Sequence, residues 1–338
     1  MNKINKLINS LKFDLRLAQP WNYKFPLILS FAYLGIHINN LHILQSIILL
    51  SAFLLCMIGV SAFAYLINDY FDQTIDKLYN KKNIFLTINP KYFSIYILTS
   101  LFAIVYPWTI LPWNKNTLLL LSLLLSAFII YSAPQTRIKN KGILGVFLDA
   151  IYAYLLSSYL TFYTFALIDR SHYDKNYYIL CVIFLWQLSI GIRSIIFHQI
   201  KDYNNDLSHN NTWVVKIGIN KALKILKTYI LPLEITMLIS SLFIISKYFI
   251  LIIPFSIFFW ILIILKYKYI FKQSLKWDYQ NFTYIFLDDY YYQCYPTLIL
   301  LFMSILNLDY AILLAIHIFL FKNIIFNYLN YLKNILIK

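Results

Sequence analysis

The stretch AYLINDYFDQTID, residues 64–76, decides the interpretation of this chain, because it places acidic residues at the end of an apolar run. The run before it has about twenty almost wholly apolar residues, the length of a membrane-spanning helix. Asn68, Asp72 and Asp76 follow at i, i+4 and i+8, and Asp69 is one turn from Asp72. On a helix this spacing stacks the side chains on one side. Carboxylates at the edge of a membrane helix are costly, so the stack indicates a functional site.

Composition defines the class of protein around this stretch. The chain has 338 residues, of which 61% are hydrophobic and 13% charged, whereas a soluble domain carries about 25% charged residues. This predicts an all-α, polytopic membrane protein with a lipid bilayer as its surroundings. The net charge of +15 is spread over short loops between apolar runs. It therefore indicates contact with lipid head groups or an anionic substrate, and we expect no nucleic-acid partner.

Hydropathy predicts nine or ten spanning helices, depending on whether Asn307–Asp309 divides the last apolar block. The predicted spans are 24–40, 43–67, 91–111, 117–133, 144–168, 177–198, 222–246, 248–266 and a final block at 290–326. Residues 1–18 have a basic amphipathic pattern that predicts a helix on the membrane surface. The predicted membrane domain is 19–326, and 327–338 is a basic tail. Three cysteines, Cys56, Cys181 and Cys294, have no metal-site spacing and no disulfide framework.

Lysine and arginine gather before the first span and after each even-numbered span. By the positive-inside rule these loops are cytoplasmic. We therefore expect an integral, multi-pass protein of the plasma membrane, or of the inner membrane if the source is bacterial. The acidic motif at the end of the second span then faces the cytoplasm.

A second acidic stretch ends the sixth span. It reads FHQIKDYNNDLSHNNTW, residues 197–213, with Asp202 and Asp206 at i, i+4. Oxygen ligands without cysteine select Mg²⁺, Mn²⁺ or Ca²⁺ over zinc, and Mg²⁺ completes its shell with water and substrate phosphates. The alternative to a metal site is that these aspartates are simply solvated residues that cap the ends of their helices. His198 either touches a substrate or makes a structural hydrogen bond.

Two further acidic positions have more than one interpretation. Asp149, early in the fifth span, either extends a polar cavity or pairs with a basic loop residue. Asp288 and Asp289 are predicted to lie in a solvated, tyrosine-rich interface.

The third stretch is the basic loop YSAPQTRIKNKG, residues 131–142. Pro134 ends the fourth span and favours a turn. Arg137, Lys139 and Lys141 then place three cations on the same side of the membrane as both acidic stretches. Arginine matches phosphate oxygens with a planar fork and lysine supplies a point charge. A diphosphate held between acids and bases is therefore the favoured interpretation, and contact with lipid head groups is the alternative.

These three stretches resemble the UbiA superfamily of intramembrane prenyltransferases. Asn68-Asp69-x-x-Asp72-x-x-x-Asp76 is similar to the first aspartate-rich motif, Asp202-x-x-x-Asp206 to the second, and Tyr131-Ser-x-Pro134…Arg137-x-Lys139 to the basic loop. The stretch QPWNYK, residues 19–24, resembles the usual start of the first helix. The resemblance covers residues 18–218 and implies a nine-helix bundle with a central cavity open to the membrane.

The resemblance also implies an activity and a set of roles. Mg²⁺ and an isoprenyl diphosphate donor bind at the motifs, and the prenyl group passes through an allylic carbocation to a small aromatic or lipid acceptor. The implied metal ligands are Asn68, Asp69, Asp72, Asp76, Asp202 and Asp206. The implied catalytic residues are Asp72, Asp202, Arg137 and Lys139, and the diphosphate contacts are Arg137, Lys139, Lys141 and Lys201. Candidate acceptor contacts are Tyr131, Ser132, Arg193 and His198, with Arg193 either binding an acceptor carboxylate or neutralising Asp202.

Some residues depart from the family pattern. Asn80-Lys81-Lys82-Asn83 replaces the Gly-Lys-x-Asn that often follows the first motif, and Asn204 and Asn205 replace acids near the second. No residue selects an acceptor, and the oligomeric state is not predicted. The rival class is a secondary transporter with an acidic cation-coupling site. Transporters place ionisable groups at broken helices near the midplane, whereas these motifs lie at helix ends. A relative that binds isoprenoid diphosphates without catalysis is the third reading.

Overall fold

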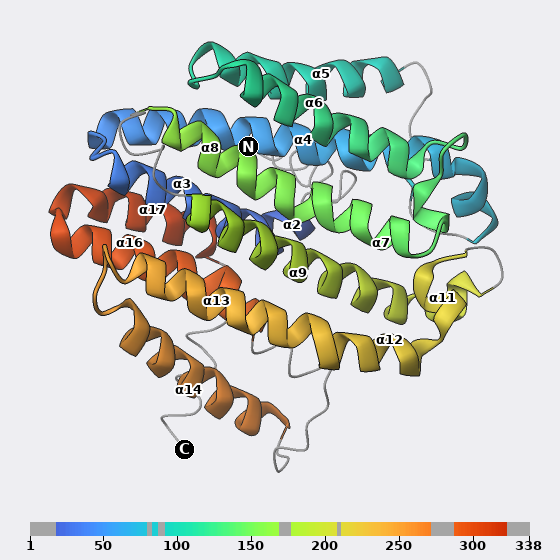
Figure 1. Ribbon diagram of the computed structural model, residues 1–338. Helices are drawn as coiled ribbons and strands as arrows, with labels where there is room; N and C mark the ends of the chain where they lie inside the picture. The colour runs from blue at the N-terminus through green and yellow to red at the C-terminus, as the bar shows by residue number, and fades with distance from the viewer. Residues whose placement is uncertain are drawn as a thin grey trace.

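The computed structural model describes residues 18–79, 83–86, 92–168, 177–207, 211–271 and 287–322, and Figure 1 shows them as a bundle of helices. Within these residues the chain forms helices and no strand, which confirms the all-α prediction. The predicted surface helix at 1–18, apart from its last residue, and the tail at 327–338 lie outside the described residues. No two of the three cysteines are bonded.

The elements run along the chain in the following order. The first half contains α2 (Ala18–Tyr23), α3 (Phe25–Ile38), α4 (Ile43–Leu78), η1 (Ile84–Leu86), α5 (Phe93–Val105), η3 (Tyr106–Thr109), α6 (Lys115–Ser132), η4 (Ile138–Asn140), α7 (Ile143–Ala150), η5 (Ile151–Leu156) and α8 (Ser157–Ala166). The second half contains α9 (Tyr177–Lys201), α10 (Tyr203–Asp206), α11 (Trp213–Ile217), α12 (Ile219–Ile225), η7 (Leu226–Ile230), α13 (Leu231–Ile245), α14 (Ile252–Phe271), η9 (Tyr290–Cys294), α16 (Tyr295–Leu306), η10 (Leu308–Tyr310) and α17 (Ala311–Leu320).

Five of the described helices are long and apolar enough to cross a membrane. They span Ile43–Leu78, Lys115–Ser132, Ile143–Ala166, Tyr178–Lys201 and Ile219–Ile245, and four shorter apolar helices span Phe25–Ile38, Phe93–Thr109, Ile252–Leu265 and Leu308–Leu320. The last apolar block is divided at Asn307, whose side chain accepts a hydrogen bond from the backbone N–H of Asp309 and so starts a new helix. Of the two predicted arrangements of this block, the pair of short helices is the one observed.

The length of α4 determines where the first acidic motif lies. Its 36 residues extend about 54 Å at 1.5 Å per residue, whereas the hydrocarbon core of a bilayer is about 30 Å thick. The predicted span 43–67 is the apolar part, and the helix continues without a break through the motif to Leu78. The acidic residues therefore lie on a helical extension beyond the apolar span.

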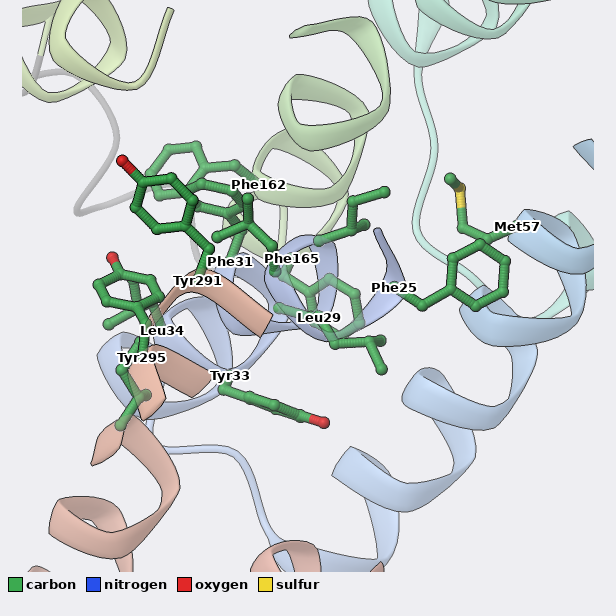
Figure 2. Close-up of a cluster of buried hydrophobic side chains, with 14 of the residues drawn as sticks. Phe25, Leu29, Phe31, Tyr33, Leu34, Met57, Phe162, Phe165, Tyr291 and Tyr295 are labelled. Atoms are coloured by element: carbon green, nitrogen blue, oxygen red, sulfur yellow. The ribbon is translucent and has the colours of Figure 1, made fainter. Parts of the chain in front are cut away.

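The core is formed around α3, which is buried along almost its whole length. Figure 2 shows its aromatic and aliphatic side chains packed between residues of α4, α8 and the η9–α16 segment. Phe31 meets Trp186 edge to face, with ring centroids 6.1 Å apart. This packing fixes α3 at the centre of the bundle and leaves α5 and α14 at its periphery, as Figure 1 shows.

Three of the helical runs contain a π-helical segment. These are η5 within the α7–α8 run, η7 within the α12–α13 run and η9 at the start of α16. Hydropathy does not reveal such segments, because a π-turn inserts one residue without changing the apolar character of the run. They are frequent at functional sites, where they redirect side chains.

Candidate functional site

The first acidic motif presents two faces rather than one stack. Asn68 and Asp72, four residues apart on α4, face the basic loop. Asp69 and Asp76, seven residues apart, face the segment that follows: Asp69 accepts a hydrogen bond from the backbone N–H of Ile84 at 3.1 Å, and Asp76 accepts one from Asn83 at 2.9 Å. The Asn83 side chain also donates to the backbone carbonyl of Asp69 at 2.6 Å. The motif thus anchors its own following segment with one face and offers the other to the basic loop.

The basic loop delivers two cations to Asp72. Arg137 donates to Oδ1 at 3.1 Å, and the Lys139 ammonium donates to Oδ2. Arg137 has a φ of +34°, a left-handed conformation that a side chain other than that of glycine rarely adopts. Such strained positions persist where surrounding contacts determine them, and they concentrate at functional sites. Burial lowers the pKa of the Lys139 ammonium, while the negative charge of Asp72 opposes that shift.

A close packing contact places the loop against α7. A Cβ on Gly145 would lie 2.9 Å from the backbone carbonyl oxygens of Ile138 and Lys139. Only glycine therefore lets η4 lie directly on α7. The loop is also bridged to the far side of the site, because Gly142, at a φ of +62°, pairs with Thr212 in an isolated bridge. The loops after α6 and after α10 therefore meet.

The second acidic motif lies where α9 gives way to α10. His198 pairs with Asp202 at 3.1 Å, one helical turn apart, and Asp206 is buried on α10. Gln199 accepts a hydrogen bond from the backbone N–H of Val214 at 3.2 Å, which ties α11 back to the end of α9. Figure 1 shows α11 beyond the end of α9 at the right-hand end of the bundle. His198 thus makes a hydrogen bond with Asp202 while its side chain stays 63% exposed.

The end of α6 contacts the first acidic motif. Ser132 donates a hydrogen bond to the Asn68 side chain at 3.3 Å. The charges of Asp72, Asp149 and Asp206 act on the ring hydroxyl of its neighbour Tyr131. By contrast, Lys141 and Lys201 are exposed side chains.

No protein-family model and no curated protein matches this sequence. Solved structures do match. A UbiA homolog from Archaeoglobus fulgidus bound to GPP and Mg²⁺ aligns with a TM-score of 0.50 and 16% identity over 91% of this chain and 99% of that chain. The same coverage and TM-score, at 17% identity, hold for a UbiA homolog from that organism bound to DMAPP and Mg²⁺. The chain has the UbiA fold. At this identity the likeness establishes the architecture, and it covers almost all of each relative.

Within this UbiA fold, Arg193 is committed to two carboxylates deep in the bundle. Its Nε donates to Glu234 on α13 at 2.8 Å, and its terminal nitrogen donates to Asp288 at 2.7 Å. Tyr291 donates to the other oxygen of Glu234 at 3.0 Å. Arg193 therefore pairs with these residues and not with Asp202. The prediction that Asp288 lies in a solvated interface is wrong, because its side chain is 15% exposed and ion-paired.

Glu234 is the buried ionic partner of Arg193 that sequence reasoning missed. It is completely buried, and it stands within the apolar run Ile219–Ile245. The sequence did contain a signal for it. An ionisable residue inside a spanning segment costs free energy, so it marks either a functional group or a partner for an opposite charge.

The donor set of the UbiA-fold motifs fits Mg²⁺ in its chemistry. Asn68 and Asp72 offer oxygen donors to the end of α6 and the basic loop, and the second motif adds the buried carboxylate of Asp206. Among the described residues no three acidic, histidine or cysteine side chains form a ready-made cage. Mg²⁺ in proteins takes one or two carboxylates and completes its shell with water and substrate phosphates.

Proposed function

We propose that this integral membrane protein transfers a prenyl group from an isoprenyl diphosphate to an acceptor within the membrane, with Mg²⁺ as its cofactor. The observation that carries the proposal is the contact of Arg137 and Lys139 with Asp72, made by a loop that the Gly142–Thr212 bridge joins to the segment after the second acidic motif. The binding of GPP or DMAPP with Mg²⁺ by the A. fulgidus UbiA homologs supports it.

The cations explain how a diphosphate is held. Arg137 and Lys139 both contact Asp72, which leaves one carboxylate between two positive groups. A diphosphate offers more negative charge and the planar oxygen geometry that a guanidinium matches. We propose that both cations turn to the diphosphate when the donor binds, and that Asn68, Asp72, Asp202 and Asp206 are the ligands on the metal side. Mg²⁺ supplies positive charge that stabilises the departing diphosphate.

Arg137 and Lys139 act on the same event. As the bond from carbon to oxygen breaks, charge grows on the diphosphate oxygen, and donors already aimed at that position lower the barrier. The allylic cation that remains needs a dry, electron-rich wall. Aromatic rings are present near the end of α6. The Tyr152 ring contacts Phe128 and Tyr131, with ring centroids 4.6 and 5.3 Å away.

A secondary transporter is the second candidate, because Arg193, Glu234 and Asp288 form an ionic cluster within the spanning region. Intramembrane charges often mark ion pathways. In this cluster each charged group already has an opposite partner, and no described residue of it belongs to the acidic motifs. The prenyltransferase therefore explains more of the structure, and a relative that binds the donor without catalysis is distinguished only by turnover.

One experiment separates these candidates. Purified protein in detergent is incubated with geranyl diphosphate, with and without Mg²⁺, and donor binding and diphosphate release are measured in the presence of an acceptor panel. A prenyltransferase binds and releases diphosphate only with Mg²⁺ and stops when EDTA is added. If the protein binds the donor with Mg²⁺ but releases no diphosphate under any condition, it is a relative that binds the donor without catalysis. The absence of Mg²⁺-dependent binding contradicts the proposal.

The cytoplasmic position of the motif loops is a separate proposal. Single cysteines placed at exposed Lys141 and Lys201 should react with an impermeant thiol reagent only from the cytoplasmic face of sealed vesicles. Labelling from the outer face would reverse the orientation inferred from the lysine and arginine bias.

A further inference from the structure

Asp149 is a carboxylate inside a spanning helix that the metal and diphosphate roles leave unused. It is partly exposed although it belongs to the apolar run Ile143–Ala166. At 1.5 Å per residue it lies about 10 Å along the helix from Gly142, on the membrane side of the basic loop. The prenyl chain of a donor extends to that same side, because an apolar chain leaves a diphosphate toward the hydrocarbon.

A hydrogen bond and a ring contact connect Asp149 to the motif site. The Tyr152 hydroxyl donates to Oδ1 of Asp149. The rings of Tyr152 and Tyr131 meet edge to face with centroids 5.3 Å apart, and Ser132, the neighbour of Tyr131, donates to the Asn68 side chain. Tyr131, Tyr152 and Asp149 therefore follow one another from the first acidic motif into the bundle.

The local backbone supports a functional arrangement. Tyr152 belongs to the π-helical segment η5, which begins directly after Asp149 and its neighbour Ala150. The close approach of α9 also fixes this point, because a Cβ on Gly191 would lie 2.7 Å from the Cα of Ala150. Asp149 and Tyr152 are three residues apart, a spacing that makes side chains neighbours on a helix, and π segments of this kind are frequent at functional sites.

The charges around Asp149 decide what it can bind. Within the part of the chain that the structure describes, Tyr152 is its hydrogen-bond donor and uses only Oδ1. The positive charge of Lys24 acts on Asp149, and so does that of His198 when protonated. The Lys24 ammonium lies over the Tyr154 ring at 4.9 Å. The second oxygen, Oδ2, can accept a hydrogen bond and cannot donate one when ionised.

We propose that Asp149 binds the acceptor and takes the proton that the acceptor loses, and that the acceptor is a neutral, hydroxyl-bearing molecule. This rests on the proposed prenyl transfer. The acceptor O–H donates to Oδ2; the oxygen lone pair forms the bond to C1 of the prenyl group, and the C1–oxygen bond breaks with its electron pair leaving on the diphosphate. The acceptor proton passes to Asp149, so charge and atoms balance.

The same geometry disfavours a carboxylated acceptor. The negative charges of Asp72, Asp149 and Asp206 all act on Tyr131. Arg193, for which an acceptor carboxylate and Asp202 were the two partners considered, is held by Glu234 and Asp288. An anionic acceptor would meet the like charge of these carboxylates, which selects against it.

The test compares Asp149→Ala with wild type using geranyl diphosphate, Mg²⁺ and three acceptors: 4-methylphenol, monoolein and 4-hydroxybenzoate. We expect wild type to prenylate a neutral acceptor in preference to 4-hydroxybenzoate. Asp149→Ala should lower kcat by about 10²–10⁴-fold, the usual contribution of a positioned base, while Mg²⁺-dependent donor binding stays as in wild type. Sodium formate, a small replacement carboxylate, should restore part of the rate, and sodium chloride should not. The control Asp309→Asn changes an exposed carboxylate and should retain full activity.

The outcomes separate two hypotheses. Without Mg²⁺-dependent donor binding by wild type, the proposed function itself fails. If wild type binds the donor but prefers 4-hydroxybenzoate or uses no neutral acceptor, the acceptor class is wrong. If Asp149→Ala keeps at least a third of the wild-type kcat, or loses donor binding, the role of Asp149 is wrong. Should Asp149→Ala fail to fold, Tyr152→Phe decides: an unchanged kcat overturns the inference, and a loss of about tenfold with unchanged donor binding supports it.

Discussion

Two ionic clusters of opposite composition stand in this protein. At the motif site one carboxylate, Asp72, lies between Arg137 and Lys139, whose side chains are 22% and 15% exposed. In the interior one guanidinium, Arg193, lies between Glu234 and Asp288 and is 1% exposed. The first cluster has an excess cation and the second an excess carboxylate.

This difference in exposure indicates which of the two clusters can exchange its ion-pair partners for a ligand. Arg137 and Lys139 belong to a loop segment outside the spanning helices and are partly exposed, so an incoming anion can reach them and replace the charge of Asp72. Arg193 and Glu234 stand on α9 and α13, both spanning helices, and breaking a buried pair leaves a charge without compensation. We infer that the first cluster is for binding and the second holds helices together.

The largest expected effect is the loss of turnover in Asp72→Ala. Removing the carboxylate takes away a proposed metal ligand and the group that orients both cations, so turnover should fall by about 10³-fold or more, equivalent to about 4 kcal/mol. Because the two cations are partly exposed, the melting temperature should change little. Turnover assays and thermal unfolding of the same preparation check both. Asp202→Ala should behave alike, and near-normal activity in either variant would refute the metal assignment.

Mutation of the interior cluster should lower stability and leave donor binding intact, the reverse of the effect of Asp72→Ala. Arg193→Met leaves Glu234 buried without its cation, and the cost of breaking a buried pair is about 3–5 kcal/mol. We expect a large fall in melting temperature, with Mg²⁺-dependent donor binding retained in the fraction that folds. The triple variant Arg193→Met, Glu234→Leu and Asp288→Leu removes all three charges and should recover most of the stability. If the triple variant is stable but has lost donor binding, the interior cluster belongs to the site after all.

An alkaline pH profile should detect the charge on Lys139. Burial lowers the pKa of this ammonium, so the group loses its proton at a pH below that of an ordinary lysine. If the ammonium holds the diphosphate, the rate should fall as pH rises through that lowered pKa. Lys139→Arg keeps the positive charge to higher pH and should keep its rate there, although its rate at neutral pH falls by a few fold. Identical alkaline profiles for the two proteins would show that Lys139 does not carry the dependence.

These two clusters also show what the sequence can and cannot predict. The run that ends at Asn68 and Asp72 is local: hydropathy and helical spacing place both side chains on one extended helix, as observed. The contacts of Arg193 are not local, because Glu234 and Asp288 lie 41 and 95 residues away. Pattern reasoning offered only Asp202 as a nearby partner. A rule that seeks opposite charges inside different spans would have paired Arg193 with Glu234.

The smallest expected effect concerns the second face of the first motif. Asn83 donates to the backbone of Asp69 and to the Asp76 side chain, so Asn83→Ala should cost about 1–3 kcal/mol of stability through groups left unpaired. If Asp69 and Asp76 serve mainly to hold the segment at Asn83 and Ile84, then Asp76→Ala and Asn83→Ala should lower activity by the same few fold. If Asp76 is a metal ligand, Asp76→Ala should lose activity as severely as Asp72→Ala, whereas Asn83→Ala should not. The ratio of the two rates therefore tells whether the motif supplies one carboxylate or two to the metal, since the segment contact is lost in both variants and cancels.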